Sequence, residues 1–276
     1  QDGLNRYDGY DFKIYRNDNQ NESSLSNNFV NILYEDNAGA LWIGTDGGLN
    51  VYDRDMDNFR KTEISDQLKI SGPVIIKTIF EDNDEKLWIG TYGSGLICLD
   101  RDRNFIGCFK HDRDDESSIS GDRISSVIQD SHGTIFIGTW GKGLNMLVRG
   151  GTEFRRYMNK ADDDRSLSEN KVDSLYCDRQ GDLWVGTTNG LNKFVNGENC
   201  FNRFSHDSAD EFSLSNRLVS KMCEDKKGNL WIGTKEGGIN IYDRDKNRFY
   251  HLKNDKDNPY SLGNNSVLDI YCDRSG

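Results

Sequence analysis

One short segment recurs along this chain, and its spacing constrains the fold more than any other feature. The segment reads LWIGT or a close variant, and an aromatic residue stands second in each copy. Successive aromatic residues are 46, 48, 48 and 47 positions apart, at Trp42, Trp88, Phe136, Trp184 and Trp231. Self-similarity at a fixed period of this length is typical of repeat architectures, in which one structural unit is copied along the chain.

Other residues keep the same period. An Asp precedes each aromatic residue by six positions, at Asp36, Asp82, Asp130, Asp178 and Asp225. A glycine turn and then Gly-Leu-Asn or a variant follow each copy, and a Ser-Leu-Ser-like signal separates most repeats. We predict that the repeated Trp residues are core residues, because Phe136 replaces one of them without breaking the pattern. The Asp series is predicted to form turns and not a set of catalytic acids.

Each repeat contains four short segments with strand character. In the first complete repeat we expect strands at residues 30–36, 41–45, about 49–53 and about 59–64, and no helical period of useful length occurs. Repeated four-stranded units are the blades of a β-propeller, so the predicted fold class is all-β. We expect complete antiparallel blades at about 25–70, 71–118, 119–166, 167–213 and 214–261, with partial blades at 1–24 and 262–276.

The two ends of the chain do not complete a blade. Two strands precede the first complete repeat and one, at 267–273, follows the last, which gives 23 predicted strands. A propeller closes by pairing its first and last blades, because an open sheet edge is an aggregation hazard. We therefore expect a fragment of a longer ring. The alternative is a six-blade ring that pools strands from both ends.

Composition argues against several classes of protein. The net charge of −11, from 35 basic and 46 acidic residues, disfavours nucleic acid, whose phosphates bind clustered Lys and Arg. An aromatic content of 11% disfavours disorder. Apolar runs are far shorter than the roughly 18 residues of a membrane span, so no membrane contact is expected. The His and Cys residues lack metal-ligand spacing, so we predict no metal and no cofactor.

The combined motif resembles a known family. LWIGT followed by GGLN and YDR, with SLSNN before the first strand of a repeat, is similar to the two-component regulator propeller repeat. In that family the repeats form the exported sensor region of bacterial hybrid two-component proteins, which commonly regulate glycan use. The resemblance implies a periplasmic, non-catalytic sensor with an oligosaccharide ligand, neighbouring propeller and β-sandwich domains, a homodimeric assembly and a kinase outside this chain. The alternatives are a propeller enzyme (a lyase or glycosidase) and a protein-interaction scaffold.

A variable position inside the constant frame is the predicted binding site. In a four-stranded antiparallel blade, the turn after the second strand shares one face with the connection that enters the blade. We call the residue after each Gly-Thr a slot residue: Asp46, Tyr92, Trp140, Thr188 and Lys235. Loops on a rigid scaffold tolerate change and often carry recognition. We expect Tyr92 and Trp140 to lie near each other and stack on sugar rings. Polar groups for hydroxyls or acidic groups would come from Asp46, Lys142, Asn189, Lys235 and Glu236, and ordinary solvated loop residues are the alternative.

Two further features allow a functional or a plain interpretation. The Asp-Arg-Asp runs at 53–57, 100–102 and 243–245 resemble Ca²⁺ loops, but they lack the Gly and Glu that complete an EF-hand, so we interpret them as turns. Cys98 and Cys108 fall on the third and fourth strands of one repeat. A disulfide across that hairpin is one possibility, and free thiols are the other.

Overall fold

The computed structural model describes residues 2–148 and 150–273, which form 22 β-strands and one short helix. Twenty strands build five four-stranded sheets, and the first two strands pair as a hairpin. The fold is therefore all-β, and the repeated sheets are blades of a β-propeller, as the repeat period predicts. The four-residue helix is far too short to cross a bilayer, and the described part of the chain offers no other candidate span.

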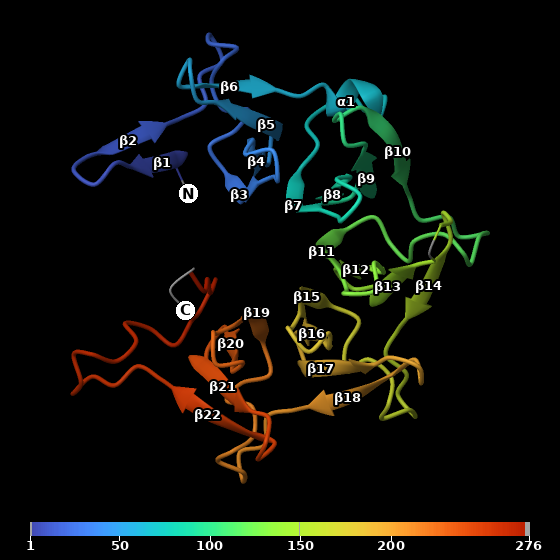
Figure 1. Cartoon of the computed structure of the whole chain (residues 1–276), viewed down its shortest axis with the longest axis vertical. Helices are drawn as coiled ribbons and strands as arrows, with labels where there is room; N and C mark the ends of the chain where they lie inside the picture. Colours follow the sequence, from blue (N-terminus) through green and yellow to red (C-terminus); the bar gives the residue numbers. More distant parts are fainter. Residues whose placement is uncertain (1, 149, 274–276) are drawn as a thin grey trace. The chain divides into compact units, whose positions relative to one another are not determined.

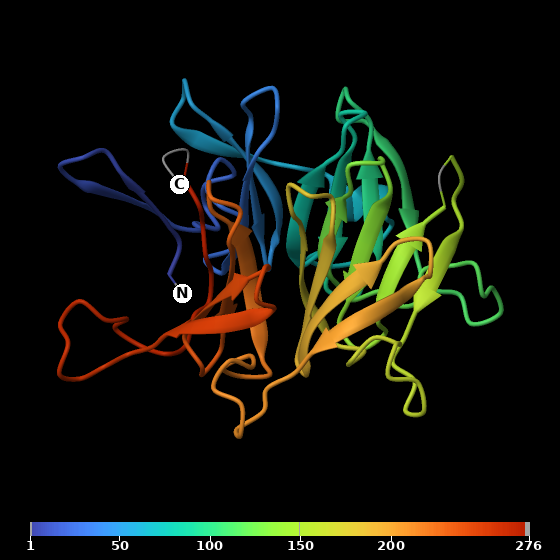
Figure 2. The ribbon, with the colours of Figure 1, turned by 60° about the horizontal axis from the view of Figure 1, so that its bottom comes forward.

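The chain divides into two compact units, Gln1–Val127 and Ile128–Gly276, and the boundary falls within β11. Before the boundary lie β1 (Leu4–Tyr7), β2 (Phe12–Tyr15), β3 (Val30–Glu35), β4 (Leu41–Thr45), β5 (Gly48–Asp53), β6 (Asn58–Lys61), α1 (Ile64–Gln67), β7 (Ile76–Glu81), β8 (Leu87–Thr91), β9 (Leu96–Leu99) and β10 (Phe105–Phe109). From the boundary onward lie β11 (Ile124–Gln129), β12 (Ile135–Thr139), β13 (Leu144–Leu147), β14 (Phe154–Tyr157), β15 (Val172–Cys177), β16 (Leu183–Thr187), β17 (Gly190–Val195), β18 (Cys200–Phe204), β19 (Val219–Glu224), β20 (Leu230–Thr234), β21 (Ile239–Asp243) and β22 (Arg248–Leu252). Within each sheet the strands follow one another in chain order (Figures 1 and 2).

The strand boundaries agree with the sequence prediction at the repeated motif and depart from it elsewhere. The LWIGT segment forms β4 at the predicted bounds. The fourth strand of that repeat is shorter than predicted, because β6 ends at Lys61 and the buried Ile64 begins α1. This helix stands in the connection that lacks the Ser-Leu-Ser signal.

The predicted strand at 267–273 is wrong, so the described residues contain 22 strands and not 23. The Val267 N–H donates to the Thr234 carbonyl, and the Ser220 hydroxyl donates to the Val267 carbonyl. This segment therefore rests on the fifth sheet. A strand needs a partner ladder on which to pair, and the described residues supply none beyond it.

The repeated Trp and Asp residues form one hydrogen-bonded pair in a sheet. The Trp42 indole Nε1 donates to Asp36 Oδ2 over 2.8 Å, while Asp36 Oδ1 accepts the Ala40 N–H. The same indole bond, at 2.7–3.0 Å, recurs at Trp88–Asp82, Trp184–Asp178 and Trp231–Asp225. The six-residue spacing thus encodes a buried indole–carboxylate bond as well as a turn.

Burial of the repeated Trp residues confirms the predicted core for three of them. Trp42, Trp88 and Trp184 are at most 4% exposed. Trp231 is only half-buried, which departs from the prediction. The Trp184 ring lies 5.5 Å from that of Tyr242 in the following sheet, whereas residues 253–273, which the structure describes beyond the last sheet, form no strand that would cover Trp231.

A glycine in the second strand lets consecutive sheets approach closely. A Cβ built on Gly44 would stand 2.6 Å from Ile76 Cγ2, and one on Gly186 would stand 2.6 Å from Val219 Cγ1. Carbon atoms in contact normally stand about 3.5–4 Å apart. The glycine of LWIGT is therefore required by packing between sheets.

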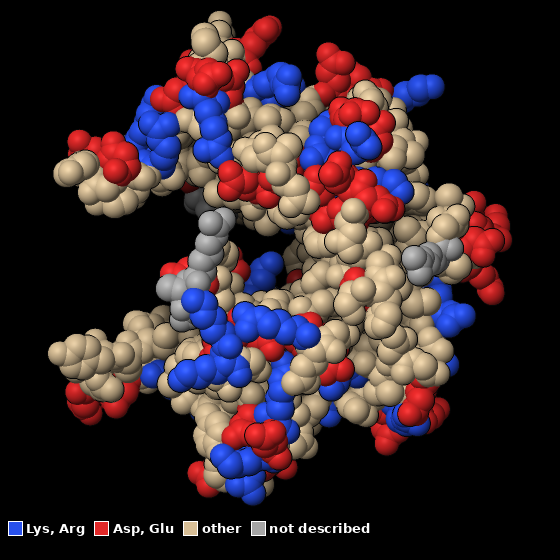
Figure 3. Space-filling model, in the orientation of Figure 1, with Lys and Arg blue, Asp and Glu red and all other residues tan. Residues whose placement is uncertain are grey.

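Charged side chains of both signs share the surface. On the face drawn in Figure 3, Lys and Arg are interspersed with Asp and Glu. Several of them form ion pairs, and those pairs matter for the sites described next.

Candidate functional site

Backbone hydrogen bonds hold four of the slot residues against the loop that enters their own sheet. The Asp46 N–H donates to the carbonyl of Phe29, the residue before β3, over 3.1 Å. The same bond recurs at three more slots: Tyr92 to Ile75, Thr188 to Lys171 and Lys235 to Leu218. Both loops therefore lie at one end of the sheet, as the strand order predicts. The slot side chain takes no part in this anchor.

A buried Asn–Ser–Thr group fixes these loops to the sheet. Asn50 Oδ1 accepts the Ser26 N–H over 3.0 Å, and Asn50 Nδ2 donates to Ser26 Oγ over 2.8 Å. Ser26 Oγ lies 2.7 Å from Thr45 Oγ1. The same three bonds recur at Asn192, Ser168 and Thr187. The Gly-Leu-Asn and Ser-Leu-Ser signals thus encode a rigid frame around the slot.

In the first unit, Lys77 brings two predicted site residues together. Its Nζ lies 3.3 Å from Asp46 Oδ1 and 5.8 Å from the Tyr92 ring centroid. The Arg123 guanidinium lies 4.9 Å from the same centroid. Asp46 is therefore ion-paired and the Tyr92 ring is in contact with cations, so neither is an isolated loop residue.

In the second unit, Trp140 and Lys142 come from one tight turn. The Trp140 side chain is 41% exposed, and Lys171 Nζ lies 4.6 Å from its ring centroid. Lys142 is exposed. Gly143 has φ +76°, and a Cβ there would stand 2.2 Å from the Tyr157 carbonyl oxygen, so the turn requires glycine. The turn therefore presents an aromatic ring and a cation to solvent.

The remaining predicted site residues differ in their environment. Lys235 Nζ lies 2.7 Å from Asp173 Oδ2, on β15 of the preceding sheet. Asn189 and Glu236, each next after a slot residue, are exposed. That Tyr92 and Trp140 lie near each other stays a prediction, since they belong to different units.

The Asp-Arg-Asp runs form turns. Asp53 Oδ1 accepts the backbone N–H groups of Asp55 and Met56, at 3.1 and 3.0 Å. Across residues 2–148 and 150–273, no group of three or more His, Cys, Asp or Glu side chains is arranged to hold a metal ion.

The suggested disulfide between Cys98 and Cys108 is wrong, and both are free thiols. Cys98 stands opposite Gly107, and Cys108 stands opposite Ile97. Successive residues of a strand point to opposite faces, so the two thiols point away from each other. Burial raises the pKa of the Cys98 thiol to about 12. Burial and the neighbouring Cys272 raise the pKa of the Cys223 thiol to about 12.

Sequence reasoning missed two buried ion-pair groups that join neighbouring sheets, which we call the arginine staples. In the first unit, Arg103 Nη2 lies 2.8 Å from Asp36 Oδ2 and 2.5 Å from Glu81 Oε1, and both carboxylate side chains are 1% exposed. Arg103 stands directly after the Asp-Arg-Asp run at 100–102 and not inside it, so that run gave only an indirect signal.

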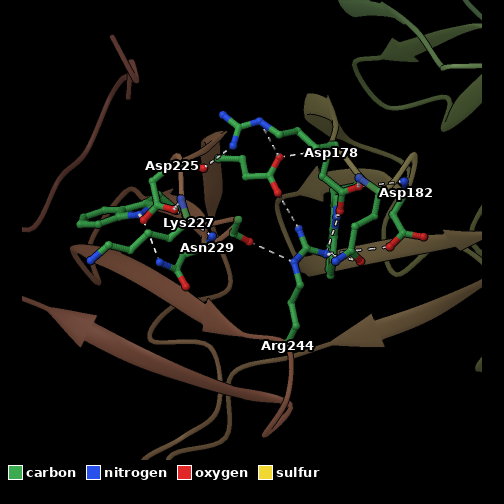
Figure 4. Close-up of polar contacts among 12 residues, drawn as sticks. Asp178, Asp182, Asp225, Lys227, Asn229 and Arg244 are labelled. Carbon is green, nitrogen blue, oxygen red and sulfur yellow. Dashed lines mark hydrogen bonds and ion pairs between the residues drawn. The ribbon is translucent and has the colours of Figure 1, made fainter. Parts of the chain in front are cut away.

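The second staple has Arg244 in the central position. Its guanidinium lies 2.8 Å from Asp178 Oδ2 and 3.4 Å from Glu224 Oε1, and Figure 4 shows Arg244 directed toward Asp178 with Asp182 nearby. In both staples the Asp comes from one sheet, and the Arg and Glu come from the next.

The pKa values of the repeated Asp residues agree with a structural role. Burial alone would raise the pKa of Asp36, but bonds from the Trp42 indole, the Ala40 N–H and Arg103 hold it below its ordinary value. Bonds from Asn229 and the Trp231 indole likewise outweigh burial and lower the pKa of Asp225 to about 2. These carboxylates stay ionised and hydrogen-bonded, as turn and packing residues do.

The repeated four-stranded sheets, the Asp–Trp pairs and the framed slots define a β-propeller repeat protein. Five segments match the family model of the two component regulator propeller, at residues 24–47, 69–93, 118–141, 166–189 and 213–236. The chain is thus built from two-component regulator propeller repeats. Among curated proteins, none matches the sequence.

Solved structures with the same fold include extracellular domains of signalling proteins. The extracellular domain of the hybrid two-component system BT3049 from Bacteroides thetaiotaomicron is 26% identical, with a TM-score of 0.72 over 91% of this chain and 31% of that one. The corresponding domain of BT4673 is 19% identical, with a TM-score of 0.55 over 91% and 39%. This chain therefore spans less than half of either structure. Virginiamycin B lyase from Staphylococcus aureus, 10% identical with a TM-score of 0.60 over 82% and 70%, shares the fold alone.

Proposed function

We propose that this chain is part of the periplasmic, non-catalytic sensor region of a hybrid two-component signalling protein, and that it binds an oligosaccharide at the slot residues. The observation that carries this proposal is the buried Asn–Ser–Thr frame, which recurs around two slots that hold different side chains, Asp46 and Thr188. Variable residues on a rigid scaffold are where binding proteins place recognition. The similarity to the BT3049 extracellular domain supports a sensor over other propeller classes.

The chemistry of the slots favours a glycan with acidic groups. Trp140 offers an exposed ring on which the C–H face of a sugar can pack. Lys171 places positive charge at that ring, and the exposed Lys142 belongs to the same turn as Trp140. Lys77 and Arg123 place positive charge at Tyr92. These cations suit carboxylate or sulfate groups.

The carboxylates at the slots support binding without bond cleavage. A glycosidase uses two carboxyl groups that flank one bond, one of them free to donate a proton. Asp46 is paired with Lys77, and Asp173 is paired with Lys235. A carboxylate held by a cation is a poor proton donor.

Signalling would follow from differential binding. A ligand shifts the packing of this region against neighbouring propeller and β-sandwich domains, and so the state of a homodimeric kinase, only if it binds one state more tightly. The ligand therefore acts through its preference for one arrangement of domains.

Calorimetry with a panel of neutral and acidic oligosaccharides tests this proposal. We expect at least one acidic member to bind, and Trp140→Ala to weaken binding by about 1–3 kcal/mol, the scale of one lost stacking platform. Tyr250→Ala is the matched control, because Tyr250 is also 41% exposed but lies on β22, away from any slot. Unchanged affinity in both Trp140→Ala and Tyr92→Ala would place the ligand elsewhere. Release of shorter products would establish an enzyme, and binding of a protein but no glycan would establish a scaffold.

A further inference from the structure

A cavity of about 330 Å³ opens between the third and fourth sheets, within the second unit. We call it the Asp130 pocket. Its lining includes Asp130 and Phe136 of one sheet and Asp182, Lys193, Phe194 and Asn196 of the next. Asp130, Asp182 and Asn196 stand in the turns that follow first and third strands, and the other three lie on β12 and β17 near those turns. The pocket therefore lies at the opposite end of the sheets from the slot residues. It is therefore separate from the proposed oligosaccharide site.

The pocket stands where an arginine staple stands between the fourth and fifth sheets. Aligning the repeats puts Phe136 at the position of Trp184, Asn196 at that of Arg244, and Cys177 at that of Glu224. The Arg and Glu of the staple, and the Trp that donates to its Asp, are thus replaced by smaller or uncharged side chains. The Asp of the staple is retained as Asp130.

The retained carboxylate is buried and lacks the donors that its counterpart has. The Asp130 side chain is only 8% exposed. Its Oδ1 accepts the backbone N–H groups of His132 and Thr134, at 2.9 and 2.8 Å. Its Oδ2 has the His132 Nδ1 at 3.8 Å, beyond hydrogen-bond distance.

The counterpart in the second staple shows what Asp130 Oδ2 is missing. Asp178 Oδ2 accepts the Trp184 indole N–H at 2.7 Å and lies 2.8 Å from the Arg244 guanidinium. Asp130 Oδ2 has neither donor and belongs to the lining of an open pocket, so a cation that enters the pocket can pair with it there.

The cationic residue of the pocket is already engaged. Lys193 Nζ lies 2.5 Å from Asp182 Oδ2 and 5.6 Å from the Trp184 ring centroid, so it neutralises Asp182 and not Asp130. Burial, together with the charges of Asp130 and Asp178, raises the pKa of the Cys177 thiol to about 12, so this thiol is neutral. The negative charge of Asp130 is therefore not balanced within the pocket.

The walls of the pocket favour a flat organic cation. The rings of Phe136 and Phe194 lie 5.6 Å apart in an edge-to-face arrangement beside the carboxylate. A guanidinium is planar and weakly hydrated, stacks on aromatic rings and donates N–H groups to carboxylates, whereas an ammonium keeps its water more strongly.

We propose that the Asp130 pocket binds a guanidinium group, which takes the place of the absent staple arginine and donates to Asp130 Oδ2. The group comes either from a free small molecule or from an Arg side chain that a protein partner presents. Both sources share the same contact with Asp130.

Titration of the full chain with methylguanidinium tests the proposal. The probe's binding is followed through the amide NMR shifts of His132 and Thr134, which donate to Asp130. Asp130→Asn keeps the Oδ1 acceptor and removes the charge, so we expect it to fold and to weaken binding about tenfold or more. Asp225→Asn is the matched control, because Asp225 occupies the equivalent turn of the fifth sheet and accepts the Trp231 indole N–H there. This substitution is expected to leave methylguanidinium binding unchanged.

A second variant fills the pocket from within. Asn196 is exposed in its turn, so Asn196→Arg should be tolerated, raise the melting temperature and abolish methylguanidinium binding. No binding to the unaltered chain at millimolar concentration, or equal binding by Asp130→Asn, would overturn the proposal. Methylammonium that binds as tightly as methylguanidinium would overturn the assignment to guanidinium.

A third arm separates the two sources. N-acetylarginine amide and a short Arg-containing peptide are titrated beside methylguanidinium. Equal affinities support a free ligand, and a peptide that binds at least tenfold more tightly supports an Arg side chain of a protein partner. Failure of this proposal leaves oligosaccharide binding at the slots untouched, because the two tests use different ligands and different residues.

Discussion

Replacement of Gly186 by Ala tests the packing between sheets most directly. A Cβ at this position would stand 2.5 Å from Ser174 Oγ and 2.6 Å from Val219 Cγ1. The Ser174 hydroxyl can rotate away, but Val219 is fully buried and its branched side chain has little rotamer freedom. Overpacking of this kind costs about 1–3 kcal/mol, and Ala gives back about 0.4–1 kcal/mol by restricting the unfolded chain. We therefore expect a net loss of about 1–2 kcal/mol.

Urea unfolding followed by circular dichroism measures that loss, with Gly107→Ala as the matched control. Gly107 also lies within a strand, but a Cβ there would meet nothing within 4 Å, so Ala should be neutral or slightly stabilising. Val219→Ala removes the obstructing methyl groups, so Gly186→Ala should cost less in its presence than alone. Simple additivity of the two changes, or a Gly186→Ala protein as stable as the unaltered one, would refute the packing argument.

Three other substitutions or conditions probe the same interfaces. Trp184→Ala should cost about 3–5 kcal/mol in denaturant melts as a large core truncation, and Trp231→Ala should cost clearly less because Trp231 is half-buried. Arg244→Gln leaves two buried carboxylates without their cation and should lower stability by up to about 3 kcal/mol, and a thermal melt indistinguishable from that of the unaltered chain would argue against the staple. Because folding lowers the pKa of Asp225 from its ordinary value of 3.8, the ionised carboxylate stabilises the folded state at pH values above 3.8. This contribution to the free energy of unfolding should fall as the pH drops and vanish near pH 2. Urea midpoints at a series of pH values check this, and Asp225→Asn should flatten the slope in that window.

The repeat was sufficient to predict the fold, because four of its recurring sequence features each determine a local element of structure. The second strand is fixed by LWIGT, the preceding turn by Asp, and the slot frame by Asn and Ser, so β4 and its equivalents lie where the sequence places them. Where one of these recurring features is missing, the prediction of the local structure was wrong. The connection that contains α1 lacks the Ser-Leu-Ser signal, and the helix there was not expected. The half-buried Trp231 and the absence of a strand at 267–273 could not be predicted from the pattern, because a repeated motif does not state whether a neighbouring strand is present.

The arginine staples and the Asp130 pocket were harder to predict for a geometric reason. Arg244 follows its strand directly, whereas Arg103 stands three residues after Asp100, yet both guanidiniums reach equivalent carboxylates. The two staple arginines therefore do not share one position in the repeat, and a comparison of repeats position by position does not pair them. The Asp130 pocket depends on what has been replaced at Phe136, Cys177 and Asn196, and the meaning of those exchanges requires knowing which residues meet across two sheets.

The backbone anchor at the slots has an evolutionary consequence. It uses the backbone N–H of the slot residue and, at Asp46 and Thr188, the side chains of the surrounding Asn, Ser and Thr, so the anchor itself places no demand on the slot side chain. A single codon change at Thr188 can then alter what the surface presents while the anchor stays intact, whereas a change at Asp46 or Lys235 also removes an ion pair. Lineages that carry this repeat can drift toward new ligands one blade at a time, and a library randomised at the five slots alone should retain a high fraction of folded members.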